Sequence, residues 1–175
     1  ISLILTFILR RISLRYGFLI GKGVSFTGGA GLGIAFFIAC LSGLSSYGLL
    51  SKQVLGFVFA SFLMFIFGLL DDFLELSIAK KFSMQLIASF VLMASGIKSD
   101  IVYLGPFLNG LITIIWVIGI TNAFNHLDVL DGLSGSVAAL AGIGLFFIAL
   151  LNHDFVWAII SLSLTGAVFG FLVFN

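Results

Sequence analysis

Charged side chains are scarce in this sequence. Only 9% of its 175 residues are Asp, Glu, Lys or Arg, while 61% are hydrophobic, and soluble domains carry about 25% charged residues. This balance excludes an ordinary soluble domain. The formal net charge of +1 also leaves no basic patch large enough to bind a phosphate backbone, so we expect no nucleic-acid partner.

Cysteine and alternating hydrophobic patterns are also lacking. The single cysteine, Cys40, cannot form an intrachain disulfide and lies in an apolar run, where packing is its expected role. The apolar runs are continuous instead of alternating, as is required of helices that satisfy their own backbone in lipid. The sequence therefore predicts an all-α fold, a polytopic transmembrane helix bundle.

Seven segments are expected in this bundle. The first is partial, because residues 1–9 fall short of the roughly 20 residues that span a bilayer. The other six lie at residues 32–50, 54–70, 84–97, 107–124, 137–151 and 155–174. The segment at 84–97 is the weakest, because Gln85 and Ser89 dilute it, and without it every later segment would be inverted. We expect a single integral-membrane domain over residues 1–175 that is truncated at both ends.

The basic residues predict the orientation. Six of the eight would lie on one side of the bilayer if all seven segments span it, and the positive-inside rule makes that side cytoplasmic: Arg10, Arg11, Arg15, Lys22, Lys80 and Lys81. Five of the seven acidic residues share this side: Asp71, Asp72, Glu75, Asp128 and Asp131. The rule explains the bases and not the acids, so the acids need an explanation of their own.

Four glycines, Gly28, Gly29, Gly31 and Gly33, open the second expected segment. No Lys-Ser/Thr pair follows them as it does in a P-loop. A turn or a helix-packing role is favoured, because small residues let helix backbones approach each other. Backbone contact with a ligand is the alternative.

Two adjacent carboxylates, Asp71 and Asp72, end an apolar segment. Charges next to the hydrocarbon are costly, so a pair there indicates a cation or a polar cavity. The alternative is a helix end that dips into the headgroups. Lys81 and Gln85 follow, one helical turn apart, and would point the same way. Lys81 would bind a phosphate or only set the topology, while Gln85 would add a supporting hydrogen bond.

A second group recurs every three residues: Asn122, Asn125, Asp128 and Asp131. On a helix each step of three turns by about 60°, so the four fan around one side and their oxygens converge. A solvated loop is the alternative. His126 would bind a nucleotide or sugar, or simply lie in the loop. Two carboxylate sites on one face suit Mg²⁺, whose remaining ligands are usually phosphate and water, with Mn²⁺ as the second candidate metal.

These two motifs resemble those of the polyprenyl-phosphate N-acetylhexosamine-1-phosphate transferases, within glycosyltransferase family 4. Residues 68–85 are similar to the family's Asp-Asp…Leu-Ser…Lys…Gln pattern, and residues 122–133 to its Asn-Ala-x-Asn-x-x-Asp-Gly-x-Asp-Gly-Leu pattern. This sequence departs from the family at four positions, where Val129 replaces Gly, Thr27 and Gly28 replace Pro and Arg, and Ile78 replaces Pro. Family members are longer and carry a third cytoplasmic motif, which this chain lacks.

The resemblance implies an enzyme that transfers a sugar-1-phosphate, N-acetylglucosamine-1-phosphate in particular, from a UDP-N-acetylhexosamine to a polyprenyl phosphate such as undecaprenyl phosphate. UMP would be released, in cell-envelope polysaccharide or peptidoglycan biosynthesis. The implied reaction depends on Mg²⁺ and occurs at the cytoplasmic face of the cell inner membrane, in a multi-pass protein compatible with a homodimer. The expected catalytic residues are Asp71, Asp72 and Asp128. The expected substrate-binding residues are Lys81, Asn122, Asn125 and His126, and the expected metal ligand is Asp131.

Two other classes of protein remain as alternatives. An ion-coupled transporter would carry its acids near the bilayer midplane, in broken helices with an internal repeat, whereas these acids lie at segment ends. A non-catalytic, degenerate homologue is the second alternative, and Val129 is the residue that favours it.

Overall fold

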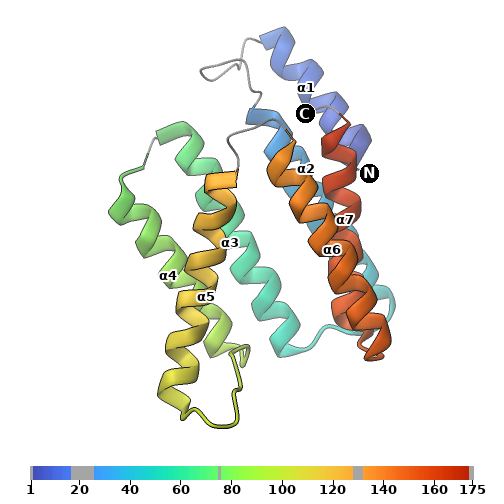
Figure 1. The fold of residues 1–175 in the computed structure, drawn as a ribbon. Helices are drawn as coiled ribbons and strands as arrows, with labels where there is room; N and C mark the ends of the chain where they lie inside the picture. The colour runs from blue at the N-terminus through green and yellow to red at the C-terminus, as the bar shows by residue number, and fades with distance from the viewer. Residues whose placement is uncertain (1, 17–25, 75, 128–131, 174–175) are drawn as a thin grey trace. The chain divides into compact units, whose positions relative to one another are not determined.

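The structure, a computed structural model, describes residues 2–16, 26–74, 76–127 and 132–173. These ranges form seven α-helices and no β-strand (Figure 1). The helices are α1 (Ser2–Tyr16), α2 (Phe26–Ser46), α3 (Lys52–Leu74), α4 (Ile78–Ala94), α5 (Pro106–Leu127), α6 (Leu133–Leu151) and α7 (Phe155–Leu172). The predicted all-α fold with seven segments is confirmed.

Five of the described helices are long and apolar enough to cross a membrane: α2, α3, α5, α6 and α7. Their most apolar stretches have a mean hydropathy between 1.7 and 2.3. Helix α4 is shorter, with 17 residues, and it corresponds to the segment that the sequence marked as the weakest. The described helices have the composition of a polytopic bundle, as predicted.

The chain divides into two compact units. The discontinuous unit holds α1, α2, α6 and α7, within residues 1–49 and 127–175, and the central unit holds α3, α4 and α5, within residues 50–126. The expectation of a single integral-membrane domain stays a prediction.

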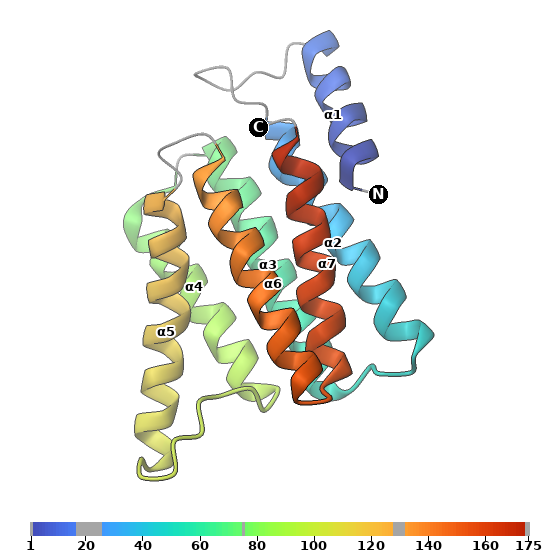
Figure 2. The same ribbon diagram turned by 45° about the vertical axis from the view of Figure 1, so that its right-hand side comes forward.

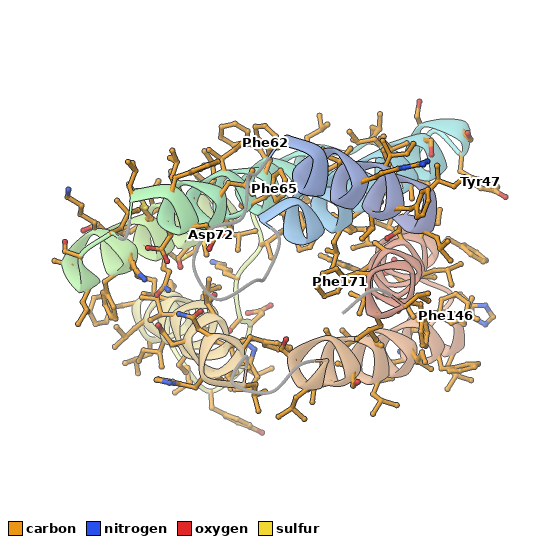
Figure 3. The ribbon with its side chains drawn as sticks, turned by 90° about the horizontal axis from the view of Figure 1, so that it is seen from above. Tyr47, Phe62, Phe65, Asp72, Phe146 and Phe171 are labelled. Carbon is orange, nitrogen blue, oxygen red and sulfur yellow. The ribbon has the colours of Figure 1, made fainter. Side chains whose placement is uncertain are left out.

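Helix α7 is the centre of the discontinuous unit, where it contacts α1, α2 and α6 (Figure 2). Small residues allow these close approaches. A methyl group at Gly31 would come within 3.2 Å of the Thr6 Cα atom of α1, and one at Gly28 within 2.8 Å of the ring of Phe171, which is labelled in Figure 3. The glycine-rich start of α2 is therefore a helix-packing surface, in agreement with the favoured interpretation.

The central unit runs up, down and up again, so α4 is antiparallel to both α3 and α5 (Figures 1 and 2). Gly56 of α3 lies so close to Ser95, just after α4, that a methyl group at Gly56 would overlap the serine side chain. Ala60 and Ala88 are buried along the same two helices. The antiparallel arrangement places the end of α3, the start of α4 and the end of α5 at one end of the unit.

Two helices begin before the apolar runs that predicted them. Helix α2 begins at Phe26, ahead of the run at 32–50, and α4 begins at Ile78, ahead of the run at 84–97. Glycines lower the hydropathy at the first start and lysines at the second, so apolar runs alone placed both starts too late. One smaller prediction, the packing role of Cys40, agrees with the structure, in which this side chain is buried.

Candidate functional site

Three helix ends meet at one end of the central unit, which we call the site end. They are the last turn of α3, the first turn of α4 and the last turns of α5 (Figure 1). Figure 3 looks onto this end and labels Asp72. The predicted site residues that the structure describes all lie on these helix ends: Asp71, Asp72, Lys81, Asn122, Asn125 and His126.

Asp71 and Lys81 form an ion pair across the turn between α3 and α4. Lys81 Nζ lies 2.7 Å from Asp71 Oδ2, and the backbone N–H of Leu76 donates to Asp71 Oδ1 at 3.0 Å. Both carboxylate oxygens therefore hold the turn. The Lys81 side chain is 37% exposed and its ammonium group has three donors, so the ion pair leaves the lysine capable of binding a second anion.

Both members of this ion pair oppose the dipole of their own helix. Asp71 lies in the last turn of α3 and Lys81 in the first turn of α4, whereas carboxylates are favoured at helix N-termini and cations at C-termini by about 0.3–1 kcal/mol. A half-exposed ion pair contributes a similar amount, about 0.2–1 kcal/mol. The ion pair and the hydrogen bond from the Leu76 N–H together offset the cost of the two dipoles, which explains how both charges are accommodated in this turn.

Asp72 has different surroundings from Asp71. Successive residues of a helix are turned by about 100° from each other, so Asp72 leaves α3 in another direction from the ion-paired carboxylate. Its side chain is exposed. Of the two adjacent carboxylates, Asp71 is built into the turn and Asp72 lies on the surface of the site end.

Gln85 and Asn122 join α4 to α5. Asn122 Nδ2 donates to Gln85 Oε1 at 3.0 Å and to the carbonyl of Ile118 at 2.8 Å. The Ile118 carbonyl can only accept a hydrogen bond, so the amide atom of Asn122 that faces it must be the nitrogen, Nδ2. The amide oxygen, Asn122 Oδ1, then lies on the other side and can accept a hydrogen bond. Gln85 is buried, with 7% exposure, and lies one turn beyond Lys81. The supporting hydrogen bond expected of Gln85 is therefore made to the second motif, a pairing that the sequence had not identified.

The other members of the second motif are only partly described. Asn125 and His126 lie in the last turn of α5 and are exposed. Asp128 and Asp131 lie outside the described residues, as do Glu75 and Val129. Within the described ranges, no group of three or more His, Cys, Asp or Glu side chains could hold a metal ion.

Comparison with known proteins identifies a family. The model of Glycosyl transferase family 4 matches residues 54–175. A Bacillus subtilis (strain 168) protein named "Probable undecaprenyl-phosphate N-acetylglucosaminyl 1-phosphate transferase" is 29% identical over 82% of this chain and 42% of its own length. An Oceanobacillus iheyensis phospho-N-acetylmuramoyl-pentapeptide-transferase is 30% identical over 72% of this chain and 45% of its own length. A Thermotoga maritima undecaprenyl-phosphate alpha-N-acetylglucosaminyl 1-phosphate transferase is 30% identical over 64% of this chain and 33% of its own length.

No solved structure matches the chain. The chain spans less than half the length of each of these three relatives. The family model nevertheless covers most of the chain, including both acidic motifs and nearly all of the central unit. The long apolar helices agree with the membrane-enzyme relatives, so the chain is a multi-pass membrane protein, and it belongs to glycosyl transferase family 4.

Proposed function

We propose that the protein transfers a sugar-1-phosphate, N-acetylglucosamine-1-phosphate in the first instance, from a UDP-sugar to a polyprenyl phosphate such as undecaprenyl phosphate, with release of UMP. The observation that carries the proposal is the site end, where the Asp71–Lys81 ion pair and the Gln85–Asn122 hydrogen bond start one turn apart on α4. Relatives named for this kind of transfer support it. The product would serve cell-envelope polysaccharide or peptidoglycan synthesis.

Both proposed substrates carry phosphate groups, and Lys81 is a cation suited to bind one of them. Asp71 holds the lysine at 2.7 Å, so the ammonium group is oriented before a substrate arrives. Preorganised charge supplies most of the catalysis in phosphoryl transfer. Asn122, Asn125 and His126 would add hydrogen-bonding groups for the nucleotide or the sugar.

In the proposed reaction, an oxygen of the polyprenyl phosphate attacks the sugar-bearing phosphorus of the UDP-sugar. A new P–O–P bond forms as the P–O–P bond to UMP breaks, so one phosphoanhydride replaces another and water is not consumed. Asp71 or Asp72 would position the lipid phosphate and accept its proton if it carries one, and Asp128 would support either step.

Mg²⁺ suits the donors at the site end. It prefers carboxylate and amide oxygens, and proteins usually hold it through one or two carboxylates together with substrate phosphates. A site end with few described carboxylates, Asp71 and Asp72, is in keeping with that mode. Asp131, four residues beyond the end of α5, would hold the ion together with the nucleotide diphosphate. When bound, Mg²⁺ would neutralise charge on the diphosphate.

The proposed location of the site end is the cytoplasmic face of the cell inner membrane. Helix α4 returns the chain between α3 and α5, as the count of basic residues along the sequence requires. Lys80 and Lys81 then lie at the opposite end of the central unit from Lys52 and Lys98. This arrangement supports the cytoplasmic orientation that the positive-inside rule predicts.

Isotope exchange tests the proposed reaction. Membranes that contain the intact protein are incubated with UDP-N-acetylglucosamine, undecaprenyl phosphate and radiolabelled UMP. We expect label to enter the UDP-sugar when Mg²⁺ is present and not when it is chelated. If exchange occurs with a different UDP-N-acetylhexosamine and not with UDP-N-acetylglucosamine, that other sugar replaces N-acetylglucosamine in the proposal. An absence of exchange with every such donor would overturn the transferase proposal and favour a transporter or a non-catalytic homologue.

A further inference from the structure

The loop between α4 and α5, at the opposite end of the central unit from the site end, turns its apolar side chains outward. Val102 is 88% exposed, Tyr103 is 96% exposed, and Phe107 at the start of α5 is 81% exposed. Such side chains are normally buried in contact with something apolar. The tip of the loop therefore lacks an apolar covering within the described residues of the central unit.

The backbone of this loop is held by the buried side chain of Asn109, which is 4% exposed. Asn109 Oδ1 accepts the N–H of Ile101 at 3.0 Å, while Asn109 Nδ2 donates to the carbonyls of Ile101 at 3.3 Å and Leu104 at 2.9 Å. The N–H of Leu104 also donates to the Ile101 carbonyl, at 2.9 Å. One side chain thus satisfies three backbone groups of the turn.

A second buried side chain extends this arrangement to the base of the loop. Thr113, one turn beyond Asn109 on α5, accepts the N–H of Ser99 at 2.9 Å and donates to the Asn109 carbonyl at 2.8 Å. Asn109 and Thr113 lie within the expected span at 107–124 and are costly there unless they are paired. Both side chains bond to the loop backbone, and these hydrogen bonds offset the cost of placing polar residues in the span.

A loop with apolar side chains outside and with the backbone groups of Ile101 and Leu104 paired inside is suited to the boundary between lipid and water. In a bilayer, backbone N–H and carbonyl groups without hydrogen-bond partners are costly, and this cost excludes loops with unpaired backbone from the hydrocarbon region. The apolar surface also continues from the loop along α5, through Phe107, Leu111 and Ile115, which lie at successive helical turns and are 81%, 44% and 60% exposed. On a membrane-spanning helix such a stripe faces lipid.

We propose that the segment Ile101–Leu104, together with Phe107, inserts into the headgroup–acyl boundary of the membrane on the side opposite the site end. Asn109 is the positioning residue, because its hydrogen bonds lower the cost of bringing the loop backbone into this layer. Tyr103 suits this depth, because tyrosine is enriched where one end of a side chain meets lipid and the other meets water. The partner that we propose is therefore lipid, and cover by protein is the outcome that the test below would detect. Insertion would anchor to the membrane the end of the central unit at which α5 begins.

Fluorescence depth measurements test the proposal. Tyr103→Trp is introduced into intact protein in which every other tryptophan, including Trp116 and Trp157, is replaced by phenylalanine, and the protein is placed in bilayers of phosphatidylethanolamine and phosphatidylglycerol. We expect blue-shifted emission that lipids brominated near the headgroup quench more strongly than lipids brominated near the chain end. Emission that acrylamide quenches and brominated lipids do not would place residue 103 in water. Emission that neither quenches would place it under protein, and either result would overturn the proposal.

The role of Asn109 has its own test in the same background. Asn109→Ala removes three hydrogen bonds and leaves the Ile101 N–H and the Leu104 carbonyl without these partners, so we expect the emission to shift to the red and acrylamide quenching to rise. Asn152→Ala is the matched control, because Asn152 is exposed and bonds only within its own helix end, to the carbonyl of Ile148. If Asn109→Ala does not fold, Thr113→Val removes the hydroxyl bonds to Ser99 and to the Asn109 carbonyl but keeps the Asn109 side chain in place. Unchanged depth of residue 103 in the folded variants would refute the positioning role.

Discussion

The hydrogen bond between Gln85 and Asn122 predicts an asymmetric pair of mutational effects. This bond ties Gln85 of the first acidic motif to Asn122 of the second, across α4 and α5. Asn122→Ala leaves the buried Gln85 amide without this partner, and an unsatisfied buried polar group costs about 1–3 kcal/mol. Gln85→Met costs less, about 0.5–1.5 kcal/mol, because Asn122 Nδ2 keeps its bond to the Ile118 carbonyl.

The double variant tests whether the two single variants lose stability through the same hydrogen bond or through two independent effects. Removing both partners abolishes the unsatisfied group, so the free energy of unfolding of Gln85→Met with Asn122→Ala should fall by about 1 kcal/mol less than the sum of the two single changes. Thr121→Ala is the matched control, because Thr121 Oγ1 donates only to the Val117 carbonyl of its own helix. It should not couple to Gln85→Met.

Reversible unfolding in mixed micelles, by titration with sodium dodecyl sulfate and far-UV circular dichroism, measures these free energies. A coupling of about 1 kcal/mol for the Gln85–Asn122 pair and none for the Thr121 control would confirm the bridge. Additive effects of Gln85→Met and Asn122→Ala would refute the reasoning, since residues that share no interaction add.

The other predictions concern the charges and the packing. Lys81→Met should lower kcat/KM for UMP release by about 10- to 100-fold, as expected when a charge-assisted bond worth about 1.5–3 kcal/mol is lost, and steady-state kinetics measure it. Asp131→Asn should abolish Mg²⁺-dependent UMP release, and near-normal turnover would remove this residue from the metal site. Gly31→Val should destabilise the discontinuous unit by about 1–3 kcal/mol, because the site is already filled by α1, whereas a Cβ at Gly29 meets nothing within 4 Å, so Gly29→Val should destabilise it less. The temperature at which the buried Cys40 reacts with a maleimide dye should fall for the first variant more than for the second.

The helical fold was largely predictable because lipid leaves the backbone few options. Continuous apolar runs between polar turns predicted the helices, and errors arose where helical residues are not apolar. The start of α2 is rich in glycine, and the start of α4 carries Lys80 and Lys81. In both places tertiary packing and charge pairing extend the helix beyond the apolar run.

The residue types of the site were also predictable, but their pairing was not. Asp71 reaches Lys81 only because the short turn after α3 brings the two helix ends together. Gln85 and Asn122 are 37 residues apart, and their contact depends on how far α5 is shifted along α4, which the separate helical patterns do not determine. The hydrogen bonds of Asn109 to the loop backbone were not predicted for the same reason, although an asparagine within an apolar span indicates a buried polar partner.

Transfer of radiolabelled sugar phosphate from UDP-N-acetylglucosamine to undecaprenyl phosphate tests the central claim most directly. The variant Asp71→Asn with Asp72→Asn removes both described carboxylates of the site end, while Asp100→Asn makes the same change at the other end of the central unit. At equal protein levels in membranes, we predict that the site-end variant loses about 100-fold or more of its turnover and that Asp100→Asn stays within about twofold of the unsubstituted protein. Equal turnover in the two variants would show that the site end is not where the transfer occurs.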